Sequence, residues 1–140
     1  MLGIKRPAPE FSLPSLNGQN FGSEQLRGKP AILNFWATWC DPCVAEMPLL
    51  EETAQNYADE LLVIGINEAD AFSDVESFVA REGLSYTILL DYDESVGQLF
   101  KVGGYPTTVF IDADGMIRAI YLGEMPPEQM KKNLRLIGIE

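Results

Sequence analysis

The sequence predicts a single α/β domain in which helices flank a central mixed β-sheet. Three observations support this: apolar strand-like runs alternate with amphipathic helical ones, one nearly continuous apolar run has the composition of a buried central strand, and turn residues near the C-terminus separate two further strands. With 140 residues and 46% hydrophobic content, the chain is long enough to bury a sizeable core. We therefore expect residues 1–140 to form one domain, with residues 1–22 as an N-terminal hairpin extension packed on it.

The first half of the chain predicts a hairpin, a central strand and a long helix. Apolar residues between positions 11 and 21 surround Asn17-Gly18, a pair typical of hairpin turns. The run Ala-Ile-Leu-Asn-Phe-Trp at 31–36 predicts a strand covered on both faces. From about residue 40 to residue 57, apolar side chains recur at helical spacing, which predicts a helix that Pro48 should kink.

The middle of the chain adds two strands and a helix. Residues 61–66 predict a second buried strand, and residues 87–90 a short third one. Between them, Ser73 and Glu76 have the spacing of a capping box, which predicts the start of a helix. These elements give the alternation of strands and helices on which the α/β prediction depends.

The last third predicts a short helix, a hairpin and a final helix. Val96, Leu99 and Phe100 mark the short helix, which Gly103-Gly104 should end. Strands at 107–111 and 116–122 flank Asp-Ala-Asp-Gly, which we interpret as a turn rather than a calcium site. The final helix carries the apolar residues Met130, Leu134 and Ile137.

Composition excludes several classes of function. Ten basic residues against 21 acidic ones give a net charge of −11, which should repel nucleic acids and anionic membrane surfaces. The sequence contains no histidine, so histidine-dependent catalysis and histidine-ligated metals are excluded. No apolar run approaches the roughly 20 residues of a membrane-spanning helix, and we expect no direct membrane insertion by residues 1–140.

The candidate chemistry lies where the central strand meets the long helix. Cys40 and Cys43 are separated by two residues, so their sulfurs can meet within one helical turn and cycle between dithiol and disulfide. At the start of a helix, the helix dipole and free backbone N–H groups favour a thiolate. Cys40 comes first and is the predicted nucleophile, while Cys43 would resolve the mixed disulfide.

These features together identify a family resemblance that spans nearly the whole chain. The sequence resembles the thioredoxin superfamily, most closely its ResA/TlpA-like branch of extracytoplasmic thiol-disulfide oxidoreductases. The residues that carry the resemblance are Ala8-Pro9-Glu10-Phe11-Ser12-Leu13, Leu26-Arg27-Gly28-Lys29, the run from Leu33 to Cys43, Val44-Ala45-Glu46, Pro48 and Gly104-Tyr105-Pro106-Thr107-Thr108. The resemblance implies a thioredoxin-like fold with an N-terminal hairpin extension and a βα insertion.

The resemblance also implies roles for residues outside the cysteine pair. It implies that Pro106 is a cis-proline facing the disulfide, which leaves the Tyr105 backbone free to pair with an extended substrate. Thioredoxin carries a buried aspartate where this chain has Asn34, so the usual proton acceptor is missing. Glu46 matches a glutamate that ResA-like proteins place near the active site, and it follows Cys43 by three residues on the same helical face. We therefore predict that Glu46 is partly buried, has a raised pKa and accepts the Cys43 proton; the alternative is a solvated helix glutamate.

The residues next to the cysteines admit both structural and functional interpretations. We expect Trp36 to pack in the core, whereas Trp39 either packs or forms an apolar platform for a partner polypeptide. Pro42 suits the first helical turn, and the charge of Asp41 should make the neighbouring thiolate less stable and the couple more reducing. We therefore place Trp39, Asp41, Pro42, Tyr105 and Pro106 in the predicted substrate-binding surface.

Two other functions remain as alternatives to thiol-disulfide exchange. Peroxiredoxins share the fold and a similar N-terminal motif, but their PxxxTxxC pattern is absent, since Asn34 stands four residues before Thr38 and Cys40 only two after it. A binding module with a structural disulfide is disfavoured, because so short a loop gains little stability from a cross-link. Two cysteines without histidine do not make a zinc site.

The sequence therefore predicts an oxidoreductase that exchanges electrons with protein cysteines, and the resemblance implies that it acts as a reductant. We expect no bound cofactor or metal, an upstream electron-donor protein and a monomeric state. The resemblance implies an extracytoplasmic location, periplasmic or beside a membrane anchor, and a role in cytochrome c maturation or the reduction of another protein's cysteines; a cytoplasmic location stays open.

Overall fold

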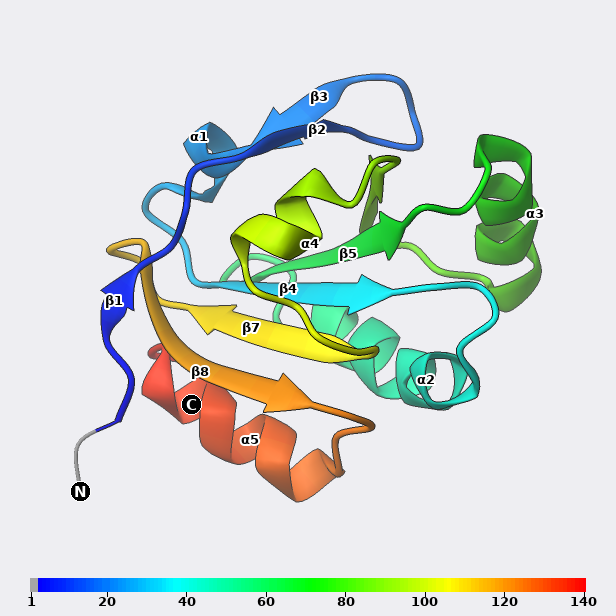
Figure 1. Ribbon diagram of the computed structural model, residues 1–140. Coiled ribbons are helices and arrows are strands. Elements are labelled where there is room, and N and C mark those ends of the chain that lie inside the picture. Colours follow the sequence, from blue (N-terminus) through cyan, green and yellow to red (C-terminus); the bar gives the residue numbers. More distant parts are fainter. Residues whose placement is uncertain (1–2) are drawn as a thin grey trace.

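The computed structural model describes residues 3–140, which form a six-stranded mixed sheet, a separate two-stranded hairpin and five helices (Figure 1). In chain order the elements are β1 (Arg6–Pro7), β2 (Ser12–Pro14), β3 (Asn20–Gly22), α1 (Ser23–Leu26), β4 (Ala31–Trp36), α2 (Asp41–Asn56), β5 (Leu62–Glu68), α3 (Phe72–Glu82), β6 (Thr87–Asp91), α4 (Ser95–Leu99), β7 (Thr107–Ile111), β8 (Met116–Leu122) and α5 (Pro127–Leu136).

Strand β4 lies in the middle of the sheet, whose order is β1-β8-β7-β4-β5-β6. It pairs parallel with β5 and antiparallel with β7, so the sheet is mixed as predicted. Every residue of β4 is buried, as its nearly continuous apolar sequence predicts for a strand covered on both faces. Strand β6 lies at the edge beyond β5, and β6 and α4 form one βα unit between α3 and β7.

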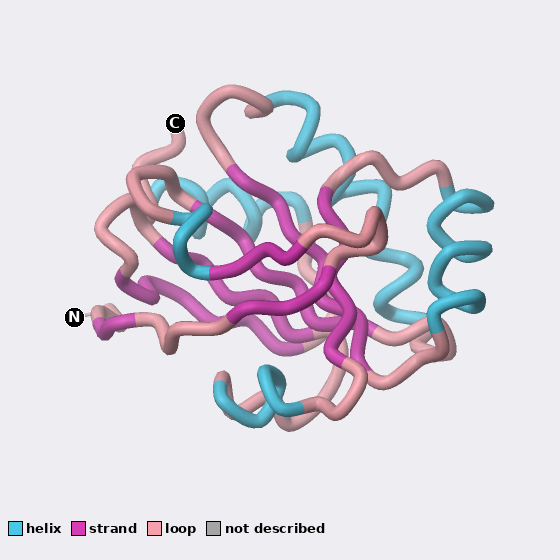
Figure 2. The backbone as a smooth tube through the Cα atoms, turned by 90° about the horizontal axis from the view of Figure 1, so that it is seen from above, coloured by secondary structure: helices cyan, strands magenta, loops and turns pink. Residues whose placement is uncertain are grey.

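The two faces of the sheet carry different helices, as Figures 1 and 2 show. One core contains apolar residues of α2, α3 and α5, among them Met47, Phe78 and Leu134. The other contains residues of α1, α4 and the hairpin, among them Leu13 and Phe100. Helix α2 follows β4 in the chain, so its first turn lies at the C-terminal end of this central strand. This is the position predicted for the cysteines.

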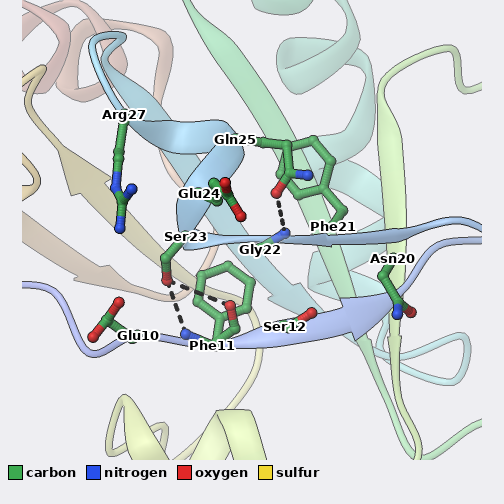
Figure 3. Close-up of a pocket in the computed structure, with 10 residues that line it drawn as sticks. All are labelled: Glu10, Phe11, Ser12, Asn20, Phe21, Gly22, Ser23, Glu24, Gln25 and Arg27. Carbon is green, nitrogen blue, oxygen red and sulfur yellow. Dashed lines mark hydrogen bonds between the residues drawn. The ribbon is translucent and has the colours of Figure 1, made fainter.

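The hairpin of β2 and β3 is held to α1 and to the edge strand β6. Phe11 N donates to Ser23 Oγ at 2.8 Å, and Gly22 N donates to Gln25 Oε1 at 2.9 Å (Figure 3). Gly22 is required here because an added Cβ would overlap the Phe11 carbonyl. Leu16 N donates to Ile88 O of β6. The polar hollow in Figure 3 is lined mostly by residues of this hairpin and α1, and it contains none of the predicted site residues.

Two predicted helix boundaries are wrong. The capping box at Ser73 and Glu76 is absent: α3 begins at Phe72, and its N-cap Ala71 makes no side-chain cap hydrogen bond. Helix α4 does not run to Gly103-Gly104, because Lys101 adopts a positive φ of 60° and Val102 N donates back to Gly97 O, which ends the helix at Leu99.

The remaining strand and helix predictions agree closely with the structure. The strands at 31–36, 107–111 and 116–122 have the predicted bounds, whereas β5 continues to Glu68 and β6 to Asp91. Short elements β1 and α1 were not predicted. Pro48 lies inside α2, and the kink expected there stays a prediction. No helix formed by residues 3–140 has both the length and the apolar character needed to cross a bilayer.

Candidate active site

Cys40 and Cys43 form a disulfide at the junction of β4 and α2. Their Cα atoms are 5.3 Å apart, Cys40 is the N-cap of α2, and Cys43 lies in its first turn. Cys43 N donates to Cys40 Sγ at 3.3 Å. A thiolate on Cys40 would receive this N–H donor and the field of the helix N-terminus, which are the features that stabilise a thiolate.

The loop before β7 lies at the same end of the strands as the disulfide. Phe35 of β4 pairs with Thr107 of β7, so the residues just before Thr107 lie beyond the end of β4. The peptide bond between Tyr105 and Pro106 is cis, which confirms the expectation from the family resemblance. The Tyr105 ring contacts the Trp39 ring edge-on, with centroids 5.9 Å apart, and Trp39 is 70% exposed. Trp39, which adjoins Cys40 in the sequence, thus forms an aromatic pair with the partly buried Tyr105.

Glu46 is buried under the first turns of α2, with only 2% of its surface exposed. Its Oε1 accepts from Asn34 Nδ2 at 2.9 Å, and its Oε2 accepts from Met125 N at 2.7 Å. Burial raises the pKa of Glu46 to about 7, although the bonds from Met125 and Asn34 oppose this; the charge of Glu124 adds to the increase. The predicted burial and raised pKa are confirmed, and a carboxyl group with this pKa can take up or release a proton near neutral pH.

Asn34, which stands where thioredoxin has an aspartate, has partners that its position in the sequence does not predict. Asn34 Nδ2 lies between Glu46 and Thr108, donating to Thr108 Oγ1 at 3.0 Å. Thr108 pairs with Asn34 across β4 and β7, a contact that strand pairing makes available once the sheet order is known. Met125 contributes only a backbone N–H from a loop 79 residues away from Glu46, and no sequence pattern signals that contact.

A second unpredicted contact holds the loop that precedes Cys40. Asp70 Oδ2 accepts from Thr38 N at 2.8 Å and from Asn67 Nδ2 at 2.9 Å. Asn67 belongs to β5, so this interaction ties the end of β5 to the segment between β4 and the disulfide. Asp70 is a positioning residue for that segment, because it contacts the backbone and not the sulfurs.

The other predicted site residues lie near the cysteines without further contacts that define a role. Asp41 and Pro42 occupy the first turn of α2 and are exposed. Trp36 is fully buried and packs on Phe78 with ring centroids 5.2 Å apart, as expected for a core residue.

Among residues 3–140, no three His, Cys, Asp or Glu side chains gather closely enough to hold a metal ion.

Comparison with known families and curated proteins gives consistent matches over most of the chain. Residues 4–120 match the model of the AhpC/TSA family. The chain is 38% identical over 132 residues to the thioredoxin-like protein YneN of Bacillus subtilis, covering 92% of this chain and 77% of that protein. It is 37% identical over 137 residues to the thiol-disulfide oxidoreductase ResA of Geobacillus thermodenitrificans, covering 97% of this chain and 79% of that protein.

Solved structures share the fold over nearly their full length. A thiol:disulfide interchange protein of the thioredoxin family from Chlorobium tepidum superposes with a TM-score of 0.86 at 26% identity, covering 98% of this chain and 99% of that one. A secreted Mycobacterium tuberculosis disulfide oxidoreductase homologous to E. coli DsbE superposes with a TM-score of 0.81 at 30% identity, covering 89% of this chain and 94% of that one. The predicted thioredoxin-like fold is confirmed.

Proposed function

The chain belongs to the AhpC/TSA family and is a thiol-disulfide oxidoreductase, and we propose that it reduces disulfides in other proteins, with Cys40 as nucleophile, Cys43 as resolving thiol and Glu46 as proton acceptor. The observation that carries the proposal is the arrangement at the start of α2: a disulfide at the helix N-terminus with a buried carboxyl group of near-neutral pKa one turn beyond Cys43. The peroxidase and structural-disulfide alternatives have no comparable support.

The first step forms a mixed disulfide between the protein and its substrate. In the reduced protein, the Cys40 thiolate attacks one sulfur of the substrate disulfide, which forms a mixed disulfide and releases the other substrate sulfur as a thiolate. The Cys43 N–H and the first turn of α2 stabilise the Cys40 thiolate before attack. The paired rings of Trp39 and Tyr105 would provide apolar contact for the substrate chain, and the backbone beside cis Pro106 would pair with an extended segment.

The second step releases the reduced substrate and needs a proton acceptor. Cys43 loses its proton to Glu46 and attacks Cys40 Sγ, so the Cys40–Cys43 disulfide forms and the second substrate thiolate leaves. Two electrons have then passed from the protein to the substrate. Regeneration requires a dithiol electron donor that reduces the Cys40–Cys43 disulfide and returns the protein to its starting state.

The direction and location of the reaction rest on the relatives. The name ResA among them, and the family resemblance, support a reductant that acts outside the cytoplasm, with cytochrome c maturation as one setting. One structural relative is described as secreted. The aromatic pair of Trp39 and Tyr105 is suited to contact with a protein substrate. The monomeric state stays a prediction.

The equilibrium reduction potential of the Cys40–Cys43 couple tests the proposed direction. The couple is equilibrated with dithiothreitol or glutathione buffers and followed by tryptophan fluorescence, since Trp39 adjoins Cys40. A potential near or below about −270 mV supports a reductant, whereas one near about −120 mV indicates an oxidant and contradicts the direction. A disulfide that is reduced only on unfolding would show a structural cross-link instead.

A further inference from the structure

Two carboxyl groups are buried together on the face of the sheet opposite Glu46. Glu68 and Asp91 end the neighbouring parallel strands β5 and β6, where they are register partners, and only 3% and 1% of their surfaces are exposed. Both side chains converge on Gly97 of α4: an added Cβ there would overlap Glu68 Oε1 and lie 3.7 Å from Asp91 Oδ2. The absence of a side chain at Gly97 makes room for the pair.

The contacts of the two groups differ, and they assign one proton to the pair. Asp91 accepts from the backbone N–H groups of Val96, at 3.2 Å, and Gly97, at 2.8 Å, so each of its carboxyl oxygens serves as an acceptor. Glu68 Oε2 has no hydrogen-bond partner among residues 3–140. Glu68 forms a side-chain hydrogen bond with Asp91, which requires a proton on one of the two groups; because both Asp91 oxygens accept from N–H groups, Glu68 is the donor.

The charged groups around Glu68 strengthen this assignment. Besides Asp91 of β6, the acids that face it are Glu94 and Asp93 from the turn before α4, and Tyr105 approaches from the loop before β7. Burial, the hydrogen bond with Asp91 and these charges raise the pKa of Glu68 to about 10. Glu68 is therefore neutral at physiological pH.

Asp91 also holds the backbone around the pair. Its carbonyl oxygen accepts from Ala69 N and Glu94 N, both at 3.2 Å. Ala69 and Glu94 have positive φ angles of 66° and 62°, a conformation that costs free energy outside glycine and persists where the surroundings impose it. The Asp91 backbone thus contacts Glu94, the N-cap of α4, while its carboxyl group holds the first turn of the same helix through Val96 N and Gly97 N.

Glu94 connects the pair to the candidate active site. Its Oε1 accepts from the Tyr105 hydroxyl at 3.2 Å, and the Tyr105 ring contacts Trp39 beside Cys40. Burial, together with Glu68 and Glu94, raises the pKa of Tyr105 above its usual range, so the hydroxyl stays protonated and donates. We propose that the buried Glu68–Asp91 pair, sharing one proton, positions Tyr105 through Glu94 and so sets the affinity of the site for its polypeptide substrate. This inference rests on the proposed function.

Single-turnover reduction of a disulfide peptide by the reduced protein tests the connection. Glu94→Ala should raise the half-saturating peptide concentration about three- to tenfold, the effect of losing one hydrogen bond, and leave the maximal rate unchanged. Tyr105→Phe should raise the half-saturating concentration by the same factor, and the double variant should raise it no further. Glu76→Ala on α3, which removes an equally exposed acid, is the matched control.

The outcomes separate the two proposals. Reduction of the small molecule hydroxyethyl disulfide should be the same in the wild-type protein, Glu94→Ala and Glu76→Ala, because Glu94 acts only through its hydrogen bond with Tyr105. A wild-type protein that reduces neither disulfide contradicts the proposed function itself. A wild-type protein that reduces the peptide, together with a Glu94→Ala variant that keeps the wild-type half-saturation, overturns only the positioning inference.

The shared proton has its own test in Glu68→Gln, which keeps a donor for Asp91 but cannot ionise. Wild-type Glu68 is protonated when folded and ionised when unfolded between pH 4.5 and about 10. The wild-type unfolding constant should therefore rise relative to that of the variant, tenfold per pH unit, when urea unfolding is measured from pH 6 to pH 9. Parallel pH profiles for the two proteins would overturn the inference.

Discussion

Two buried glutamates on opposite faces of one sheet differ in what their carboxyl groups contact. Glu46, under α2, receives N–H donors from Asn34 and Met125, and its pKa is about 7. Glu68, under α4, faces Asp91, its Oε2 has no hydrogen-bond partner within residues 3–140, and its pKa is about 10. Burial is the largest cause of the increase in both, so the difference comes from the neighbours. Donors keep one acid able to exchange a proton near neutral pH, and a second acid keeps the other protonated.

The position of each glutamate matches this difference. Glu46 lies on the face that carries Cys43, where the proposed reaction needs a group that gains and loses a proton in every cycle. The Glu68–Asp91 pair lies beside α4, where a proton that stays in place keeps a hydrogen-bonded turn together. The same residue type is thus suited to proton exchange in one region and to holding structure in the other.

The largest expected effect on stability comes from a substitution in the Glu68–Asp91 pair. Asp91→Ala removes the acceptor of Val96 N and Gly97 N and leaves Glu68 without its partner. We expect a loss of about 3–5 kcal/mol in the free energy of unfolding, measured by urea denaturation at pH 7. Thr53→Ala on α2, which removes another buried side-chain hydrogen bond, provides a control. A loss no larger than that of the control would show that the Asp91 contacts contribute little.

The next effect concerns Glu46 and the sign of its pH dependence. The folded pKa of about 7 exceeds the ordinary value of 4.5, so the folded protein binds a proton that the unfolded chain releases between these pH values. The contribution of the Glu46 proton to the free energy of unfolding is fully present below pH 4.5, falls as pH rises and is gone above about pH 7. Relative to Glu46→Gln, the free energy of unfolding of the wild-type protein should fall by about 3 kcal/mol between pH 4 and pH 8.

The same variant links that proton to the reaction. In Glu46→Gln, the release of substrate from the mixed disulfide by Cys43 should lose its dependence on a group titrating near pH 7, as measured by rapid-quench kinetics. Modification of Cys40 by iodoacetamide serves as the control, because it precedes the Cys43 step. A release step whose pH profile equals that of the wild-type protein would exclude Glu46 as the proton acceptor.

Sequence reasoning succeeded where the signal is local. The buried strand at 31–36, the helix that begins at the cysteines and the hairpin at 107–122 each follow from a pattern within a few residues. The cis bond before Pro106 came only from the family resemblance, because nothing in the residue types requires it. The end of α4 was missed because Lys101 adopts a conformation that composition assigns to glycine.

The contacts that set the two carboxyl groups apart are long-range, and the sequence does not predict them. Met125 reaches Glu46 through a backbone N–H, which any residue other than proline could supply. Glu68 and Asp91 meet only because β5 and β6 pair in one register, and a shift of one residue would turn one of the side chains to the other face. Each acid appears in the sequence as an ordinary polar residue at the end of an apolar run.

The smallest expected effect is also the most direct test of how donors tune Glu46. Asn34→Ala removes the donor to Glu46 Oε1 but keeps the donor from Met125 N, and the bond from Asn34 lowers the pKa. The pKa of Glu46 should therefore rise above about 7, by roughly one unit or less. Carboxyl-selective NMR titration of the oxidised protein measures it, and Thr108→Val, which removes only the second contact of Asn34, is the matched control. An unchanged pKa in Asn34→Ala would mean that the Asn34 donor does not tune Glu46, and the contrast with Glu68 would then rest on Met125 N and Asp91.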